Sequence, residues 1–153
     1  MSCKELIVNK TAWSIVCVIG AVVMAAIAIV SAVMGGCDTM VELANGNSAP
    51  MKCHWTFVAD TFIPIIGVAI ALMAITCKDQ SGRRAAAVGY IVTAIVAACM
   101  PASFGIGLCA MPEMHCHSTA TIVWVLCAIA VVIGIVQVVK SNPAAADLPK
   151  RTI

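Results

Sequence analysis

A short motif of sulfur and imidazole side chains occurs twice in this chain. The first copy is Met51-Lys52-Cys53-His54 and the second, 63 residues later, is Met114-His115-Cys116-His117. Thiolate, thioether and imidazole together suit Cu(I), and Zn(II) accepts the thiolate and the imidazole. Two histidines that meet near a symmetry axis could also hold one metal ion or a haem iron. The candidate ligands for copper, zinc or haem are therefore Met51, Cys53, His54, Met114, His115, Cys116 and His117.

Two more cysteines extend the pattern, because Cys37 precedes the first copy and Cys109 precedes the second. Four cysteines can pair in three ways. Pairing Cys37 with Cys53 and Cys109 with Cys116 keeps each bond within one copy and ties neighbouring helix ends together. Disulfides form in oxidising compartments, and each would stabilise the fold by about 2–4 kcal/mol. This structural interpretation uses the four cysteines without any ligand.

A third interpretation concerns reactive thiols. Cys53 and Cys116 lie where helices are predicted to begin, and a helix N-terminus favours the thiolate. Such thiolates could exchange disulfides with a protein partner or a quinone. No Cys-x-x-Cys sequence occurs in the chain, which weighs against an enzyme dedicated to this reaction. We therefore expect a non-catalytic protein and keep a membrane thiol-disulfide oxidoreductase as an alternative.

The composition indicates that these motifs lie beside a lipid bilayer. The chain of 153 residues is 62% hydrophobic and 10% charged, whereas soluble domains are about 25% charged. Lipid cannot satisfy backbone polar groups, so segments that cross it are expected to be helices of about 20 mostly apolar residues. We predict an all-α integral membrane protein with four spans, at Ala12 to Gly36, Phe57 to Cys77, Ala85 to Leu108 and Ala120 to Val139.

Basic residues indicate which way the spans are inserted. Lysine and arginine occur in both tails and in the short segment 78–84, whereas the two cysteine-bearing loops contain only Lys52. By the positive-inside rule, we expect a multi-pass protein of the cell membrane with both termini in the cytoplasm and both motifs outside. The formal net charge of +2 then reflects topology, and no basic patch predicts binding to nucleic acid.

The two halves of the chain resemble copies of one helical hairpin. In each half a first span leads to a cysteine and a second span follows a motif. Both hairpins start on the cytoplasmic side, so the repeats are parallel and a pseudo-twofold axis should run along the membrane normal. The expected fold is a four-helix bundle with both motifs at its outer rim. It forms a single membrane domain, 1–153, with repeat A at about 11–78, repeat B at about 84–140 and a cytoplasmic C-terminal tail at 141–153.

This order of span, cysteine, short loop, Met-x-Cys-His and span, present twice, resembles a family of small, functionally uncharacterised bacterial membrane proteins with four transmembrane helices. Members of that family are often encoded beside components of ATP-binding-cassette (ABC) transporters of the macrolide-exporter type. The resemblance therefore implies an ABC-type permease or ATPase as a partner. It depends on Cys37, Met51, Cys53, His54, Cys109, Met114, Cys116 and His117.

Asp60 is the one acidic residue inside the four predicted spans. It lies seven residues after Cys53, on the same helix face, and its counterpart in the second copy is Val123. A carboxylate within a span is a candidate functional group by default. The alternative is a shallow interfacial residue that reaches for Lys52 or solvent.

Together these observations predict a binding or accessory subunit of a membrane complex, such as an ABC-type exporter, with a soft metal (copper or zinc) or haem as its specific ligand. The expected surroundings are the lipid bilayer, and the expected partners are the permease or ATPase or a second copy of the chain. Two alternatives stay open: the thiol-disulfide oxidoreductase, and a purely structural partner protein stapled by disulfides.

Overall fold

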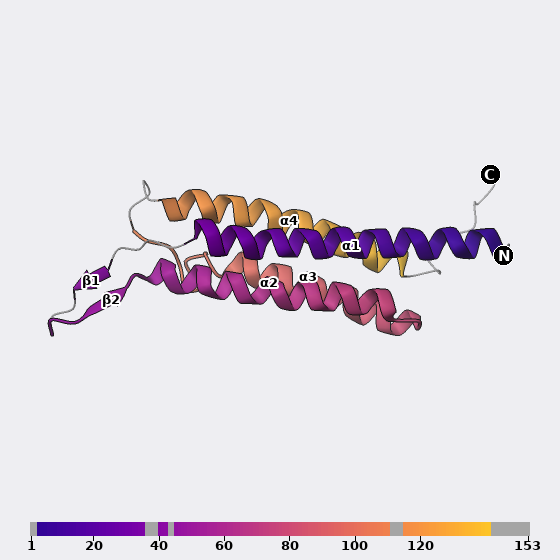
Figure 1. Cartoon of the computed structure of the whole chain (residues 1–153), viewed down its shortest axis with the longest axis horizontal. Helices are drawn as coiled ribbons and strands as arrows, with labels where there is room; N and C mark the ends of the chain where they lie inside the picture. Colours follow the sequence, from indigo (N-terminus) through magenta and orange to yellow (C-terminus); the bar gives the residue numbers. More distant parts are fainter. Residues whose placement is uncertain (1–2, 36–39, 43–44, 111–114, 142–153) are drawn as a thin grey trace, which may run out of the picture.

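Four long helices form the body of the protein (Figure 1). The computed structural model describes residues 3–35, 40–42, 45–110 and 115–141. The elements are α1 (Cys3–Met34), β1 (Met40–Glu42), β2 (Ser48–Pro50), α2 (Lys52–Thr76), α3 (Gln80–Cys99) and α4 (His115–Lys140). All four helices contain a stretch long and apolar enough to cross a membrane. The predicted all-α bundle of four transmembrane helices is thus confirmed, while the predicted tail falls almost wholly outside the described residues.

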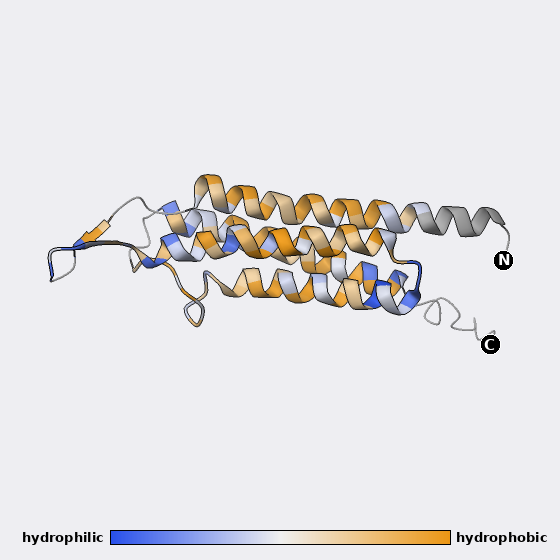
Figure 2. Cartoon of the chain, turned by 60° about the horizontal axis from the view of Figure 1, so that its bottom comes forward, coloured by the Kyte–Doolittle hydropathy of each residue, from blue (hydrophilic) through white to orange (hydrophobic). Residues whose placement is uncertain are grey.

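The apolar side chains are distributed as a bilayer requires. Large side chains such as Val22, Val33 and Val132 are mostly exposed on the outside of the bundle. Small residues, among them Ala94 and Ala130, are buried between the helices. Figure 2 shows apolar residues along most of the helix length and polar residues gathered toward the ends. Such a surface is stable in lipid and not in water, so the lipid bilayer is the protein's environment.

The helices pack in a ring in chain order, with α1 also contacting α4. Small residues allow the close approach that membrane helices use in place of a hydrophobic driving force. At Gly67 an added Cβ would lie 3.0 Å from the side chain of Met24. Buried hydrogen bonds also join helices, since the Tyr90 hydroxyl donates to the Gly20 carbonyl at 2.9 Å. The first contact packs α1 against α2 within one hairpin, and the second joins the two hairpins.

Helix boundaries differ from the predicted spans in two ways. α2 and α4 begin earlier than Phe57 and Ala120, so both motifs fall in or beside a first helical turn. α3 ends at Cys99, whereas the predicted span continued to Leu108. Pro101 explains the early end, because it lacks the backbone N–H that the next helical hydrogen bond needs, although Met100 before it still has helical dihedral angles. Residues 100–109 instead form apolar turns, which hydropathy alone cannot distinguish from a span.

A small hairpin, which was not predicted, precedes α2. β1 and β2 pair antiparallel, with Val41 opposite Ala49. Its turn contains Gly46 at φ +79°, and the Asn47 N–H donates to the Asn45 side-chain oxygen at 3.1 Å. The hairpin projects beyond the end of the bundle where α2 and α4 begin (Figure 1). We call this end the motif end; α1 begins and α4 ends at the opposite end.

Candidate functional site

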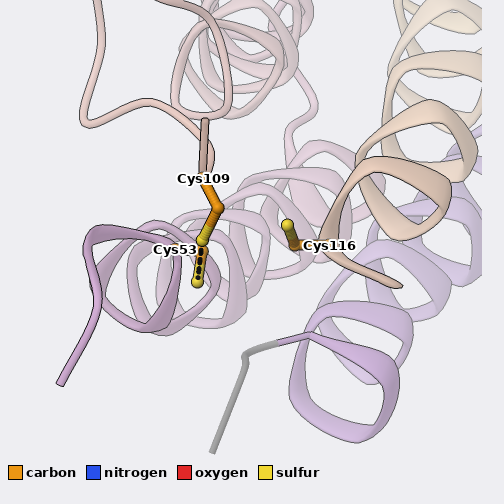
Figure 3. A group of neighbouring side chains, drawn as sticks. All are labelled: Cys53, Cys109 and Cys116. Atoms are coloured by element: carbon orange, nitrogen blue, oxygen red, sulfur yellow. Dashed lines mark hydrogen bonds between the residues drawn. The ribbon is translucent and has the colours of Figure 1, made fainter. Parts of the chain in front are cut away.

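Three cysteines meet at the motif end (Figure 3). Cys53 lies in the first turn of α2, Cys116 in the first turn of α4, and Cys109 in the segment that leads toward α4. Their Sγ atoms all lie within 4.8 Å of one another. Cys53 and Cys116 are fully buried, and Cys109 is half-buried. We refer to these three residues as the thiol cluster.

A close sulfur–sulfur contact within the thiol cluster crosses from one hairpin to the other. The thiol of Cys109 donates to the Sγ atom of Cys53 at 2.9 Å. The same thiol lies 3.8 Å from the thioether sulfur of Met51. Phe57 and Leu108 pack against these residues and form an apolar wall. Four sulfur atoms therefore lie close together at the end of the bundle.

Two threonines explain how the chain brings these sulfur atoms together. The hydroxyl of Thr56 donates to the Gly107 carbonyl at 2.6 Å, and that of Thr119 donates to the Met34 carbonyl at 3.0 Å. Each threonine follows a motif cysteine by three residues and bonds to the other hairpin. Gly107 has φ +85°, a conformation that glycine adopts without steric cost. The Thr56 bond therefore holds the segment that contains Cys109 over the start of α2.

The histidines do not join the thiol cluster. His54 and His115 are exposed, and the His54 ring packs edge-on against Trp55 with centroids 5.5 Å apart. The Nε2 atom of His117 lies 3.0 Å from the main-chain oxygen of Cys109, not from its sulfur. His54 and His117 also line different cavities. Among the described residues, the metal-ligand group that the structure assembles at this end consists of cysteines alone.

Two of the predicted site residues, Cys37 and Met114, lie outside the described residues. The pairing of Cys37 with Cys53 therefore stays a prediction. The pairing of Cys109 with Cys116 also stays a prediction, since these two sulfurs lie near each other but are not bonded. The 2.9 Å contact joins Cys109 to Cys53 across the hairpins, a pairing that the repeat did not lead us to expect.

The surroundings of Cys109 favour its neutral form. Burial raises the pKa of this thiol to about 12, with further contributions from its hydrogen bond with Cys53 and from the neighbouring Cys53 and Cys116 sulfurs. At neutral pH the side chain is thus a protonated thiol. A soft metal ion that binds there must displace its proton.

A cavity of about 410 Å³ opens beside the thiol cluster. Lys52, His117 and Trp124 line it together with the turns between α3 and α4. Cys109 is the member of the thiol cluster that also lines this cavity. A solute that enters the cavity therefore reaches the thiol cluster through Cys109.

Asp60 lies two turns farther along α2 and is completely buried. Neither of its carboxylate oxygens has a hydrogen-bond partner among the described residues. Its side chain reaches neither Lys52 nor solvent, so the shallow interfacial interpretation is wrong. Val123, its counterpart on α4, is also completely buried, which shows that both positions face the interior.

Fold and site define a small multi-pass membrane protein with a cysteine cluster at one end of a four-helix bundle. The chain belongs to the family described as a domain of unknown function, DUF4418, whose model matches residues 15–140. The predicted membership of an uncharacterised family is thus confirmed. No curated protein and no solved structure matches the chain.

Proposed function

We propose that this protein binds a soft metal ion, with Cu(I) preferred, through the thiolates of Cys53, Cys109 and Cys116. The observation that carries the proposal is the convergence of three Sγ atoms within 4.8 Å at one end of a membrane bundle. Thiolates select Cu(I), Zn(II) and iron–sulfur clusters over hard cations. A buried group of thiols from three separate segments is well arranged to surround one such ion.

The choice among soft metals depends on the other donors nearby. The Met51 thioether is 3.8 Å from the Cys109 sulfur, and thioethers are ligands for copper rather than for zinc. Structural zinc sites hold four ligands, commonly with histidine among them. Because imidazole is absent from the described thiol cluster, an all-sulfur site suits Cu(I) better than it suits Zn(II) or a histidine-ligated haem.

We also propose that the protein is a non-catalytic accessory subunit of an exporter complex, and that the thiol cluster faces outward. Lys78, Arg83, Arg84 and Lys140 lie toward the end opposite the motifs, where the positive-inside rule places the cytoplasm. The family resemblance makes an ABC-type permease or ATPase the expected partner, and a second copy of the chain is the alternative.

The two hairpins are, in this proposal, copies of one unit related by a pseudo-twofold axis along the membrane normal. The two threonine bonds support this relation, because each runs from one second helix to the other hairpin's first half. The ring order of helix contacts supports it as well, since the relation exchanges α1 with α3 and α2 with α4.

Metal analysis tests the proposed site. Protein purified in detergent under reducing conditions, then loaded with Cu(I) and desalted, should retain about one copper per chain, as expected for one cluster of thiolates. Cys116→Ala should lose that copper, because it removes one of three ligands. Cys127→Ala is the matched control: this cysteine is equally buried on the same helix but lies outside the thiol cluster. Equal copper retention by both variants would contradict the proposal.

A further inference from the structure

We infer that the thiol cluster is under redox control, and that its oxidised form is a disulfide between Cys53 and Cys109 that joins the two hairpins. The disulfide itself is independent of the metal proposal. Its consequence, loss of the metal site, depends on that proposal, because oxidation removes two of the three thiolates.

The starting point is the short contact between these two sulfurs. Their Sγ atoms are 2.9 Å apart, whereas a covalent S–S bond spans about 2.05 Å. A small movement of the two side chains therefore brings the atoms to bonding distance. The fold maintains this arrangement, because the Thr56 hydroxyl holds the Gly107 carbonyl two residues before Cys109.

The cavity supplies a route for the oxidant. Cys53 and Cys116 are buried, whereas Cys109 is half-buried and lines the cavity of about 410 Å³. Lys52 belongs to the same lining, and its positive charge favours a ligand with carboxylates. The chemical class that fits is a small disulfide, RS–SR, that carries negative charge.

The reaction is two thiol-disulfide exchanges in sequence. The Cys109 thiol releases its proton to solvent as its sulfur attacks one sulfur of RS–SR, which forms a mixed disulfide and releases RS⁻. The Cys53 thiolate then attacks the Cys109 sulfur of that mixed disulfide, which forms the Cys53–Cys109 bond and releases the second RS⁻. The two cysteines lose two electrons and two protons, and the external disulfide gains them as two molecules of RSH.

Chain cleavage distinguishes this bond from bonds within a hairpin. Trypsin can cut at Lys78, Arg83 and Arg84, which lie between Cys53 and Cys109 in the sequence. After treatment of the reduced protein with oxidised glutathione and then trypsin, the two halves should stay together on a non-reducing gel and separate on a reducing one. A second cleavage after methionine with cyanogen bromide separates Cys53 from Cys77 at Met73 and Cys109 from Cys116 at Met111 and Met114, so that mass spectrometry should identify the linked peptides as those of Cys53 and Cys109.

Two cysteine variants test whether the cross-link is specific to Cys53 and Cys109. Cys109→Ala should abolish the Cys53–Cys109 peptide, and Cys127→Ala should leave it unchanged. Halves that separate without reduction, or peptides that link Cys109 to Cys116, would overturn the inference. Copper retention, measured on the reduced sample, tests the metal site separately from the disulfide. Copper binding without the cross-link refutes this inference alone, and the cross-link without copper binding refutes the metal site alone.

Discussion

The second helices of the two hairpins, α2 and α4, begin alike and then diverge. Each has a buried cysteine in its first turn and, three residues later, a threonine bonded to the opposite hairpin. Two turns farther in, α2 carries Asp60 where α4 carries Val123. Both positions are completely buried, so the same environment holds a carboxyl group in one helix and an alkyl group in the other.

In the described part of the chain, only the motif end of the bundle needs residues from both halves to complete a site. At the motif end the thiol cluster takes sulfur atoms from both hairpins, so either copy of the motif alone would leave the site incomplete. The bundle interior makes no such demand on symmetry. Asp60 is a buried carboxyl group that only the first hairpin supplies, at a cost in stability that an alkyl side chain would avoid.

Giving α4 the buried carboxyl group that α2 has should change the stability of the protein more than any other substitution described below. Val123→Asp places a second carboxyl group in the interior, where the structure offers Asp60 itself no hydrogen bond among the described residues. An uncompensated buried charge should destabilise the fold by about 3–5 kcal/mol. The measurement is thermal or denaturant unfolding in detergent. Val123→Ala serves as the control for simple loss of volume, and a variant as stable as the wild type would refute the assignment of this position to the interior.

The chemical reactivity of Cys109 should differ strongly from that of an ordinary thiol. Only the thiolate is alkylated, and a pKa of about 12 keeps Cys109 protonated across the neutral range. We expect alkylation by iodoacetamide at pH 8 to be on the order of a thousandfold slower than in unfolded protein, where a thiol has a pKa of about 8.5. The rate should continue to rise with pH above 9, followed by mass spectrometry of the labelled peptide. A rate that levels off near pH 9 would mean that the thiol is not held in its neutral form.

Giving α2 the alkyl side chain that α4 has at this position should stabilise the protein. Asp60→Val removes a buried carboxyl group without a described partner and installs the side chain that α4 already has at this position. We expect a gain of about 1–3 kcal/mol in the free energy of unfolding. Asp60→Asn, which keeps the polarity, should not show this gain. If Asp60→Val proved less stable than the wild type, the carboxyl group would have to possess a stabilising partner.

The smallest effects should come from the two threonines. Thr56→Val and Thr119→Val each leave a backbone carbonyl without its donor, and each should cost about 1 kcal/mol. Thr56→Val should also slow the Cys53–Cys109 cross-link, because it releases the segment that holds Cys109 in place. Thr119→Val should affect that cross-link much less. Equal slowing by both variants would show that Thr56 has no special part in positioning Cys109.

Much of the fold follows from the sequence because apolar runs of this length have few alternatives in lipid. The helices cover most of the predicted spans, but each begins several residues before its span, and α3 ends before Pro101. The turns after it are as apolar as a span, and only backbone chemistry marks the boundary. The hairpin of β1 and β2 was missed because each strand has just three residues.

The site was predicted in part, and helical geometry explains the rest. Successive residues on a helix point about 100° apart, so a buried Cys53 turns His54 away from the thiol cluster. The prediction grouped Cys53 with His54 as ligands because they are neighbours in the sequence. Residues on the same face of a helix, three or four positions apart, are the ones that point to a common site. Thr56, at three residues from Cys53, shares that face, and its recurrence as Thr119 was the signal for the cross-bonds. The place of Cys109 depends on the turns after α3, which no periodicity describes.

X-ray absorption spectroscopy of the copper-loaded protein tests the metal site most directly, because it reports the atoms bound to the ion. Three converging thiolates from two hairpins predict a Cu(I) spectrum with a first shell of at least three sulfur atoms and no imidazole. A first shell that contained histidine nitrogen, or that kept its sulfur count in Cys116→Ala, would contradict a site built from Cys53, Cys109 and Cys116.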